Sequence, residues 1–492
     1  MNASIFVLSA GRGRRAHGKN MRIQVFAVFA HLAAAAYETR FHEQTIDHFD
    51  ARNSSHFRQR YLIDFTHWGQ QGGLPNGCRG PILFYTGNEG PITAFAESNG
   101  FMTKVLAPAF GALVVFGEAR YYGLSQPEGG SGRFTYLSTE QILADYASLL
   151  IALRAELKAE SCPAVAFGGS YGGTLTTLFR LKYPHVVAGG LAASAPLGYY
   201  AIGGWAARNV KSTTWFDIVR RTYDKARKGC YTDLVDAVRL ANATAHEPGG
   251  PGELTSTFGL CAAPAKVDAF IYWITEALES IPQIDYPEPS GSLPASPVAR
   301  VCELDWSAPL VALAKVAAWF YGKQPKGCIA HATNDQIGGG TPGDGPEPHS
   351  PWGYQSCTET LHPFSTAAGA WRSYTFDDDA IGKLCASYYG VRPRLGWLEE
   401  WSGGYAIADR NLTTNLIWSN GRLDPWSGGG FLRPSDAVPG GAVFVMEKTA
   451  HHQDLRAPCN ADPAELVEVR KKEKAIIWGW ILQAVSQRAI LD

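Results

Sequence analysis

The chain has 492 residues, which is too many for one average domain and enough to bury a large core. Hydrophobic residues make up 46% of it and charged residues only 18%, so the composition excludes a disordered protein. With 44 basic and 45 acidic residues the formal net charge is -1, which excludes a basic surface field for nucleic acid or an anionic membrane.

The first predicted element is a signal peptide ending before Tyr37. From Met21 the chain runs through one arginine and a short apolar stretch to small residues that fit a cleavage site. Residues 1–20 are either an extended n-region or lie upstream of the start Met that is used, and a core helix over 25–36 is the alternative. No run in the chain is apolar and long enough to predict a membrane span. Three glycosylation sequons follow, beginning at Asn53, Asn242 and Asn411.

Apolar runs bounded by turn residues predict buried strands. They cover residues 81–86, 112–117, 164–168, 190–194, 414–419 and 442–446. Helical patterns lie between and after them, the best over 140–157, where Ser138 to Gln141 fit a capping box, and another over 464–483. Near-continuous hydrophobic strands alternating with helices predict a parallel sheet with helices on both faces.

The alternation of predicted strands and helices ends after Pro196. Helical stretches such as 213–227 and 267–280 are then separated by loops rich in glycine and proline, which predicts a mostly helical insertion. The expected divisions are an N-terminal extension with signal peptide over 1–36, the first part of the α/β domain over 37–197, the helical cap insertion over 198–349 and the second part over 350–492.

A Gly-x-Ser-x-Gly motif ends the third predicted strand, within Gly168 to Gly173, directly before a helical pattern. The glycines permit a sharp turn that exposes the Ser170 hydroxyl, and the helix N-terminus faces developing negative charge. The motif alone occurs by chance in a chain with 53 glycines, so the strand and helix around it give it weight. Together they predict an α/β-hydrolase fold with Ser170 as the nucleophile.

A serine hydroxyl needs a base to take its proton and a carboxylate to orient that base. In α/β-hydrolases the chain order is serine, then aspartate or glutamate, then histidine, with the last two placed after late strands. Asp424 and His451 follow the last two predicted strands in this order. The rival base is His452, and the rival acids are Asp409 and Asp454.

Eight blocks of sequence in a fixed order match a known family. They are FHEQTIDHFD (41–50), FYTGNEG (84–90), ARYYG (119–123), GGSYGG (168–173), KYPHVVAGGLAASAP (182–196), WGYQSCTE (352–359), SNGRLDPWSGGG (419–430) and AHHQDLR (450–456). Over nearly all of the region after residue 36, the chain resembles the serine-peptidase family of lysosomal Pro-X carboxypeptidase and dipeptidyl peptidase II. By position the family's triad falls on Ser170, Asp424 and His451, in agreement with the order of the strands.

The resemblance implies cleavage of peptides on the carboxyl side of proline. It also implies that the helical insertion roofs the site and restricts cleavage to chain ends. The oxyanion requires backbone donors, for which we expect the N–H of Tyr171 and an amide of the turn 87–90, with Glu89 and Gly90 as candidates. The resemblance also implies that Trp426 is a wall of the proline pocket, since its family counterpart sits beside the triad acid, and a flat indole offers apolar area to a rigid ring.

Three residues depart from the family's pattern. Thr174 replaces the methionine that follows GGSYGG, His362 stands where methionine or leucine tends to occur, and Ala119 replaces the histidine of EHRYYG. A relaxed preference for proline is therefore expected. Asp335 in the insertion is a candidate for holding the free amine that a dipeptidyl peptidase must bind, the alternative being a solvated loop aspartate. The segments FGLCAAP and IDYPEP resemble the dipeptidyl branch.

The nine cysteines form no CxxC pair, which favours disulfides over zinc or thioredoxin-type sites. Disulfides require an oxidising compartment, in agreement with the signal peptide. The resemblance implies three pairs: Cys357–Cys385, Cys230–Cys302 and Cys261–Cys328. A Cys78–Cys162 bridge is a further hypothesis, because both residues precede neighbouring parallel strands at the same end. Cys459 would then remain unpaired.

The sequence thus predicts a serine exopeptidase of dipeptidyl peptidase II or Pro-X carboxypeptidase type, secreted or lysosomal or vacuolar. The first alternative is an esterase or lipase on the same fold, and the second is a non-catalytic hydrolase-fold binding protein. The expected partner is a peptide substrate, and a homodimer is left open. No cofactor, no metal, no membrane span and no nucleic-acid partner are expected.

Overall fold

The computed structural model of the chain describes residues 37–127, 134–200, 208–323, 327–330 and 350–488. The predicted signal peptide and the candidate residue Asp335 lie outside these described residues. Within the same ranges, no helix combines the length and the apolar character that crossing a membrane would need.

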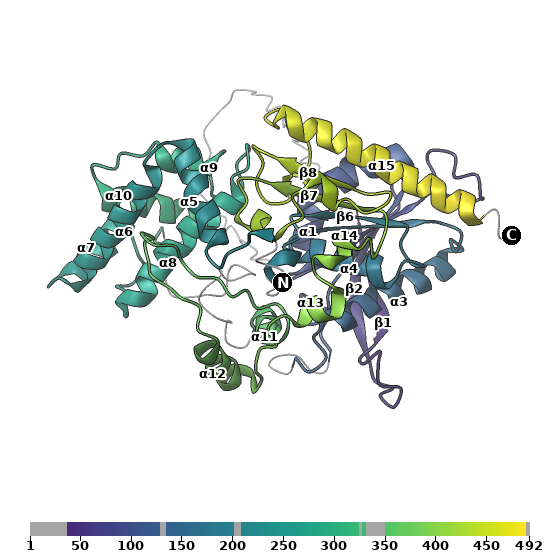
Figure 1. Cartoon of the computed structure of the whole chain (residues 1–492), viewed down its shortest axis with the longest axis horizontal. Coiled ribbons are helices and arrows are strands. Elements are labelled where there is room, and N and C mark those ends of the chain that lie inside the picture. The colour runs from purple at the N-terminus through teal and green to yellow at the C-terminus, as the bar shows by residue number, and fades with distance from the viewer. Residues whose placement is uncertain (1–36, 128–133, 201–207, 324–326, 331–349, 489–492) are drawn as a thin grey trace, which may run out of the picture. The chain divides into compact units, whose positions relative to one another are not determined.

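The described residues build one eight-stranded sheet, in the order β1-β2-β4-β3-β5-β6-β7-β8 (Figure 1). The strands are β1 (Glu38–Thr45), β2 (His56–Asp64), β3 (Ile82–Thr86), β4 (Leu113–Gly117), β5 (Ala164–Gly169), β6 (Gly189–Ala193), β7 (Leu416–Gly421) and β8 (Ala442–Met446). β2 pairs antiparallel with both β1 and β4, whereas all pairs from β4 to β8 are parallel. This mixed topology is the predicted α/β-hydrolase fold.

The six predicted strands are confirmed, with their ends shifted by at most two residues. β1 and β2 were not predicted, because β1 is largely exposed and alternates charged with other side chains rather than forming an apolar run. Parallel strands β3, β4 and β5 are buried along their whole length, which is why their apolar runs were readable.

Two helices lie on opposite faces of the sheet. A Cβ on Gly189 would meet the Trp480 ring of α15 (Ala464–Arg488), whereas one on Gly190 would meet Thr176 of α4 (Tyr171–Lys182). Neighbouring residues of a strand point to opposite faces, so α4 and α15 sandwich β6 between them. The predicted two-sided cover of the sheet is confirmed.

Helix α3 (Thr139–Leu157) begins with only half of the predicted capping box. Ser138 Oγ accepts from the Gln141 N–H at 3.3 Å. The Gln141 side chain does not return to Ser138, since it accepts from the His48 N–H (3.1 Å) and donates to Asp47 (2.6 Å). The glutamine therefore connects the start of the helix to the segment after β1. The prediction of a reciprocal bond from the Gln141 side chain to Ser138 is wrong.

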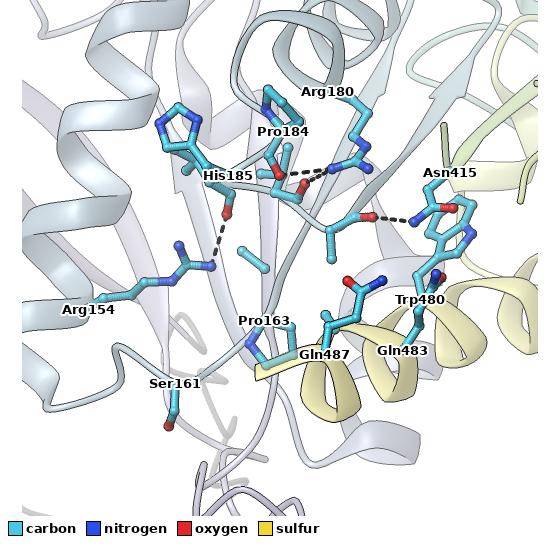
Figure 2. A pocket seen from close by; sticks show the side chains of 15 residues that line it. Arg154, Ser161, Pro163, Arg180, Pro184, His185, Asn415, Trp480, Gln483 and Gln487 are labelled. Atoms are coloured by element: carbon cyan, nitrogen blue, oxygen red, sulfur yellow. Dashed lines mark hydrogen bonds between the residues drawn. The ribbon is translucent and has the colours of Figure 1, made fainter. Parts of the chain in front are cut away.

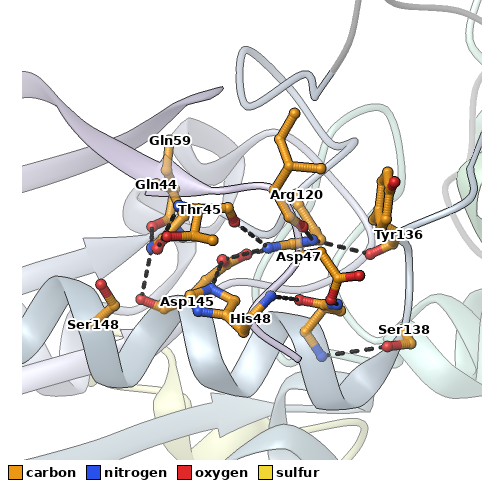
Figure 3. A network of polar contacts seen from close by, with 12 residues as sticks. Gln44, Thr45, Asp47, His48, Gln59, Arg120, Tyr136, Ser138, Asp145 and Ser148 are labelled. Atoms are coloured by element: carbon orange, nitrogen blue, oxygen red, sulfur yellow. Dashed lines mark hydrogen bonds and ion pairs between the residues drawn. The ribbon is translucent and has the colours of Figure 1, made fainter. Parts of the chain in front are cut away.

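A buried polar network joins α3 to the first strands (Figure 3). Arg120 donates to both carboxylate oxygens of Asp145, at 2.7 and 2.6 Å, and His48 Nε2 contacts the same carboxylate at 2.8 Å. Arg120 also donates to the backbone carbonyls of Thr45 and Ile46, at 3.1 and 2.6 Å. The two charges are fully buried and are satisfied by each other and by the backbone.

The chain between β6 and β7 is mostly helical. Its described helices of four or more residues are α5 (Thr214–Ala226), α6 (Cys230–His246), α7 (Gly250–Phe258), α8 (Val267–Ser280), α9 (Pro297–Cys302), α10 (Pro309–Tyr321), α11 (Pro351–Thr358), α12 (Asp378–Tyr389), α13 (Trp397–Ser402) and α14 (Ala406–Asp409), besides short 3₁₀ turns. Helices α5 to α10, teal in Figure 1, pack on one another. The helical character of this region is confirmed, whereas the boundaries at 198 and 349 stay a prediction.

Four disulfides connect the predicted cysteine pairs. They are Cys78–Cys162, Cys230–Cys302, Cys261–Cys328 and Cys357–Cys385, with Cα–Cα distances of 5.1, 5.4, 5.0 and 5.5 Å. The first confirms the hypothesis drawn from the neighbouring strands β3 and β5, and Cys459 is a free thiol. Two of the bridges fasten the helical region to itself: Cys230–Cys302 joins α6 to α9, and Cys261–Cys328 joins the segments that follow α7 and α10.

Candidate active site

Ser170 lies in a strained turn between β5 and α4. Its backbone φ of 59° and ψ of -128° fall in a region that residues with a side chain rarely adopt. A Cβ on Gly168 would lie 2.1 Å from the Gly172 carbonyl oxygen, so only glycine fits there. The Ser170 N–H donates to Ala193 O (2.9 Å), its carbonyl accepts from the Thr174 N–H (3.0 Å), and the residue is partly exposed. The turn thus presents the hydroxyl in a fixed direction.

Asp424 and His451 lie after β7 and β8 and are hydrogen bonded to each other. His451 Nδ1 is 2.7 Å from Asp424 Oδ2, and Oδ1 of the same carboxylate accepts from the Trp426 N–H at 3.0 Å. Both side chains are buried, and His451 Nε2 has no hydrogen-bond partner within the described part of the chain. An imidazole held in this way keeps Nε2 available to take a proton.

Contacts of His452 show that the histidine pair packs against the serine turn. A Cβ on Gly169 would lie 2.8 Å from the His452 ring, and the His452 N–H donates to Ser194 Oγ at 2.8 Å. The rings of His451 and His452 have centroids 4.4 Å apart. The carboxyl ends of β5, β6, β7 and β8 therefore bring the predicted nucleophile, acid and base to one edge of the sheet.

The rival candidates have other partners. Burial lowers the pKa of His452 well below its ordinary value, with the nearby His451 acting in the same direction. Asp454 accepts from Ser419 Oγ at 2.5 Å, and Asp409 pairs with Arg208. Neither of these two carboxylates contacts His451, so the geometry favours Asp424 as its partner.

Backbone donors for an oxyanion lie on both sides of Ser170. Tyr171 is the first residue of α4, where the backbone N–H has no carbonyl partner within the helix. In the turn 87–90 the Gly90 N–H, one of the expected donors, donates instead to Asn88 O at 2.7 Å. This leaves the amides of Asn88 and Glu89 as the candidates from that turn.

Aromatic rings surround the predicted substrate-binding residues Trp426 and His362. The His362 ring lies 5.1 Å from that of Trp426, 4.7 Å from that of Tyr200 and 5.3 Å from that of Phe364, on which it stacks. The Thr174 hydroxyl, in the first turn of α4, contacts the Tyr200 hydroxyl. Three of the four predicted substrate-binding residues thus gather near the acid and the nucleophile.

Gln283 is a site residue that the sequence did not reveal. It lies in a short 3₁₀ turn (Ile281–Ile284) after α8, and its carbonyl oxygen accepts from the His451 N–H at 3.0 Å. Its side-chain Oε1 accepts from Trp426 Nε1 at 2.9 Å. The helical region is therefore hydrogen bonded both to the histidine loop and to the turn after Asp424. A single glutamine after a helix gives no motif by which this role could be found.

Replacing Gln283 by Met should lower kcat/KM by about tenfold, because the Trp426 N–H loses its acceptor and the ring is no longer held. Gln283→Glu keeps an acceptor oxygen at the same reach and should restore most of the activity. Steady-state kinetics of both variants, beside their melting temperatures, check this. An unchanged kcat/KM for Gln283→Met would show that the contact does not position the site.

The buried carboxyl of Glu359 lies near the side chain of Tyr171, the residue that follows Ser170. Glu359 Oε1 accepts from the Thr139 N–H (2.8 Å) and hydroxyl (2.9 Å) and from Gln355 Nε2 (3.2 Å). The Tyr171 hydroxyl bonds the same Thr139 and Gln355 side chains, at 2.9 and 2.8 Å. Burial raises the pKa of Glu359 to about 7, with no cationic side chain among its hydrogen-bond partners.

The free energy of unfolding should fall as pH rises. The folded protein retains the Glu359 proton up to about pH 7, whereas the unfolded chain releases it near the ordinary pKa of 4.5. Stabilisation is thus complete below the unfolded value and is lost on the way to pH 7, by on the order of 3 kcal/mol. Urea unfolding between pH 4.5 and 7.5 should show this slope in the wild type and a flatter one in Glu359→Gln. The exposed Glu156→Gln is the matched control, and equal slopes in all three proteins would contradict the assignment.

A pocket of about 260 Å³ lies at the opposite edge of the sheet, under α15 (Figure 2). Its basic side chains point to backbone carbonyls: Arg180 donates to those of Pro184 and Val187, at 3.0 and 2.5 Å, and Arg154 to that of Val186 at 2.9 Å. These contacts fasten the turn before β6. The pocket lies at the amino ends of the strands, away from Ser170.

Comparisons with known proteins match one family and several similar sequences. The family model described as serine carboxypeptidase S28 matches residues 44–473. The chain is similar to lysosomal Pro-X carboxypeptidase of Mus musculus, at 32% identity over 92% of this chain and 91% of the relative. It is also similar to that of Homo sapiens, at 34% identity over 91% and 89%. Prolyl carboxy peptidase like protein 5 of Caenorhabditis elegans is 34% identical over 90% of each chain.

Solved structures show a more distant likeness. Proline iminopeptidase of Mycobacterium smegmatis matches with a TM-score of 0.39 and 11% identity, over 92% of this chain and 100% of that one. The peroxisomal α/β-hydrolase Lpx1 of Saccharomyces cerevisiae matches with a TM-score of 0.39 and 10% identity, over 91% and 88%.

Proposed function

The chain belongs to the serine carboxypeptidase S28 family and is a serine-type exopeptidase, and on this premise we propose that Ser170, His451 and Asp424 form its catalytic triad. The observation that supports the assignment best is the 2.7 Å contact between His451 Nδ1 and Asp424, made beside a serine held at positive φ. Both features are what an acyl-transfer site requires.

In the proposed reaction Ser170 Oγ attacks the carbonyl carbon of the scissile peptide bond while His451 Nε2 takes the hydroxyl proton. Asp424 holds the imidazole through Nδ1–H and stabilises its positive charge. The negative oxygen accepts from the Tyr171 N–H and from an amide of the turn 87–90. His451 then gives its proton to the leaving amine, and a water molecule releases the acyl group by the same steps.

We infer that the substrate is a peptide with proline before the scissile bond and that the C-terminal residue is released. The mouse and human proteins that are similar to this chain over about nine tenths of its length are named lysosomal Pro-X carboxypeptidase. The aromatic rings of Trp426, Tyr199 and Phe364 offer apolar faces to a pyrrolidine ring. The bonds of Gln283 to the histidine loop support a cap over the site, which restricts cleavage to chain ends.

Two matched substrates test this proposal. One is an N-blocked peptide ending in Pro-Phe with a free carboxylate, and the other is an Ala-Pro amide with a free amine. Release of phenylalanine from the first by the wild type, and not by Ser170→Ala, is expected. Cleavage of the second alone would instead assign the chain to the dipeptidyl branch, and hydrolysis of short acyl esters alone would favour the esterase alternative.

The four disulfides and the lysosomal names of the relatives support a place in the secretory pathway, and we infer delivery to a lysosome or vacuole. The sequons at Asn242 and Asn411 lie at exposed positions, as glycan acceptors must. Immunolocalisation of the full chain against a lysosomal marker checks the inference.

A further inference from the structure

A pair of buried carboxyl groups lies under the loop that carries His451. Asp454 belongs to the 3₁₀ turn Gln453–Leu455 of this histidine loop (450–456), and Glu473 lies on α15. The two residues are 1% and 0% exposed, and their carboxyl groups contact each other. Neither group takes part in the reaction proposed above.

One basic side chain serves three carboxyl groups in this place. Arg470 Nη1 donates to Asp462 at 2.6 Å, and the rest of the guanidinium donates to three backbone carbonyls of the histidine loop, at 2.8, 2.9 and 3.0 Å. Among the side chains that the structure describes, no basic group lies at ion-pair distance from Asp454 or Glu473, and Arg470 attracts them from further away. The charge of Arg470 is therefore matched by Asp462, and the pair has no cation of its own.

This balance of charges requires the pair to keep a proton. Two ionised carboxylates in contact and away from water repel each other, so such a pair holds one proton between its oxygens. Ser419 Oγ donates to Asp454 Oδ2 at 2.5 Å, which stabilises the ionised form of Asp454. Burial, and next the charge of Asp454, raise the pKa of Glu473 well above its ordinary value. Glu473 is therefore the proton carrier and donates a hydrogen bond to Asp454.

The pair connects the base to the framework of the sheet. Asp454 lies three residues after His451, and its partner Ser419 on β7 lies five residues before Asp424. The Asp454 side chain thus joins the histidine loop both to the strand that leads to the acid and to Glu473 on α15. A displacement of Asp454 is transmitted through two intervening residues to the His451 ring, whose bond to Asp424 depends on its position.

The other titratable and charged groups around the pair do not supply the missing counter-charge. Burial raises the pKa of Tyr286 to about 12, so this phenol, which lies near Asp454, stays neutral. Arg456 lies over the Tyr286 ring at 4.1 Å and pairs with Glu288 at 3.4 Å. Burial lowers the pKa of His452 well below its ordinary value, so its ring is neutral. A change of charge in this cluster therefore falls on the carboxyl pair.

We propose that Asp454 and Glu473 are a positioning pair for the general base, in which one shared proton holds the histidine loop on β7 and α15. This proposal rests on the proposed function, because it concerns the regulation of the same site. The shared hydrogen bond is complete in acid and is lost as the pH rises through the raised pKa of the pair. Two negative charges then face each other, the turn separates from α15, and His451 is no longer aligned with Ser170. The peptidase is thereby switched off reversibly outside an acidic compartment.

Glu473→Gln separates the hydrogen bond from the charge, because the amide still donates to Asp454 but cannot ionise. The wild type should lose kcat at high pH, by about tenfold for each pH unit beyond the pKa of the pair, whereas Glu473→Gln should stay active there. Glu473→Leu removes the donor and should lower kcat at every pH. The kcat for the N-blocked Pro-Phe peptide, measured from about pH 5 to 9, checks this. The exposed Glu468→Gln on the same helix is the matched control and should follow the wild type.

Two measures separate positioning from folding. Active enzyme is counted at pH 5 by fluorophosphonate titration, so a variant that folds poorly is still compared per active site. Wild-type enzyme held at the alkaline end of the range and returned to pH 5 should recover its kcat. Asp454→Asn also keeps a hydrogen bond without a second charge, so it should abolish the alkaline loss as well and serves where Glu473→Gln does not fold.

An alkaline loss of kcat that is equal in the wild type and in both amide variants would overturn the proposal. So would a wild type that shows no such loss, or one whose loss persists after return to pH 5. Failure to cleave the peptide at any pH, or equal cleavage by Ser170→Ala, would overturn the proposed function instead.

Discussion

Ser170→Ala protein should fold as the wild type does and hydrolyse peptides about 10⁶-fold more slowly. The alanine keeps the backbone turn but has no oxygen to attack the substrate, so His451 and the oxyanion donors can only assist water. Turnover of the Pro-Phe peptide, labelling by a fluorophosphonate and the melting temperature should be measured together. The expected result is loss of turnover and of labelling at an unchanged melting temperature.

Two further variants separate the parts of this site. Asp424→Asn should lower kcat by about 10⁴-fold, because an amide leaves the imidazole in the wrong tautomer. Ser161→Ala, at a partly exposed position in the pocket of Figure 2, is the matched serine control and should leave kcat unchanged. Retention of more than about one hundredth of the activity by Ser170→Ala would contradict its role as the nucleophile.

Asp145→Leu should destabilise the protein by about 3–5 kcal/mol, the largest effect we expect on stability. The substitution leaves the Arg120 guanidinium in a fully buried position without its carboxylate and removes the partner of His48. Urea unfolding followed by tryptophan fluorescence measures the change, and the activity of the folded fraction should be retained.

The double variant Arg120→Met and Asp145→Leu is the control for this interpretation. Removing both charges abolishes the uncompensated ion, so the double variant should be more stable than Asp145→Leu alone. The carbonyls of Thr45 and Ile46 still lose their donor, so recovery should be partial. A loss below about 1 kcal/mol for Asp145→Leu would mean that water reaches the guanidinium.

Local pattern was enough for the central strands and for the candidate triad. β5 and β7 are buried throughout and begin with apolar runs, and Ser170 follows β5 directly, whereas Asp424 lies three residues after the end of β7. β1 was missed because its side chains are mostly exposed, so that no apolar run marks it. The position of β1 in the fold depends on Arg120 and Asp145. These two residues are 25 positions apart, so a pattern in a short stretch of sequence does not show that they pair.

Knowledge of the fold made one long-range contact predictable, the Cys78–Cys162 disulfide, whereas the contacts of Gln283 could not be predicted. Cys78 and Cys162 could be paired because the hydrolase fold makes β3 and β5 neighbours, and the bridge is present. Gln283 could not be found, because its bonds to His451 and Trp426 require the helical region to be docked on the sheet. Sequence order therefore predicted the acid and base candidates but not what holds them in position.

Strand β1 forms one end of the sheet and has consequences for self-association. An edge strand offers unpaired backbone groups to a strand of another molecule, and charged side chains along it oppose such an addition. Glu38 and Arg40 form an ion pair at 2.8 Å on this strand, and Arg58 of β2 lies over the Phe41 ring at 4.3 Å. A second molecule that extended the sheet here would have to desolvate these charges. Any homodimer should therefore form through another surface, and this edge should resist fibrous aggregation at the concentrations of a crowded compartment.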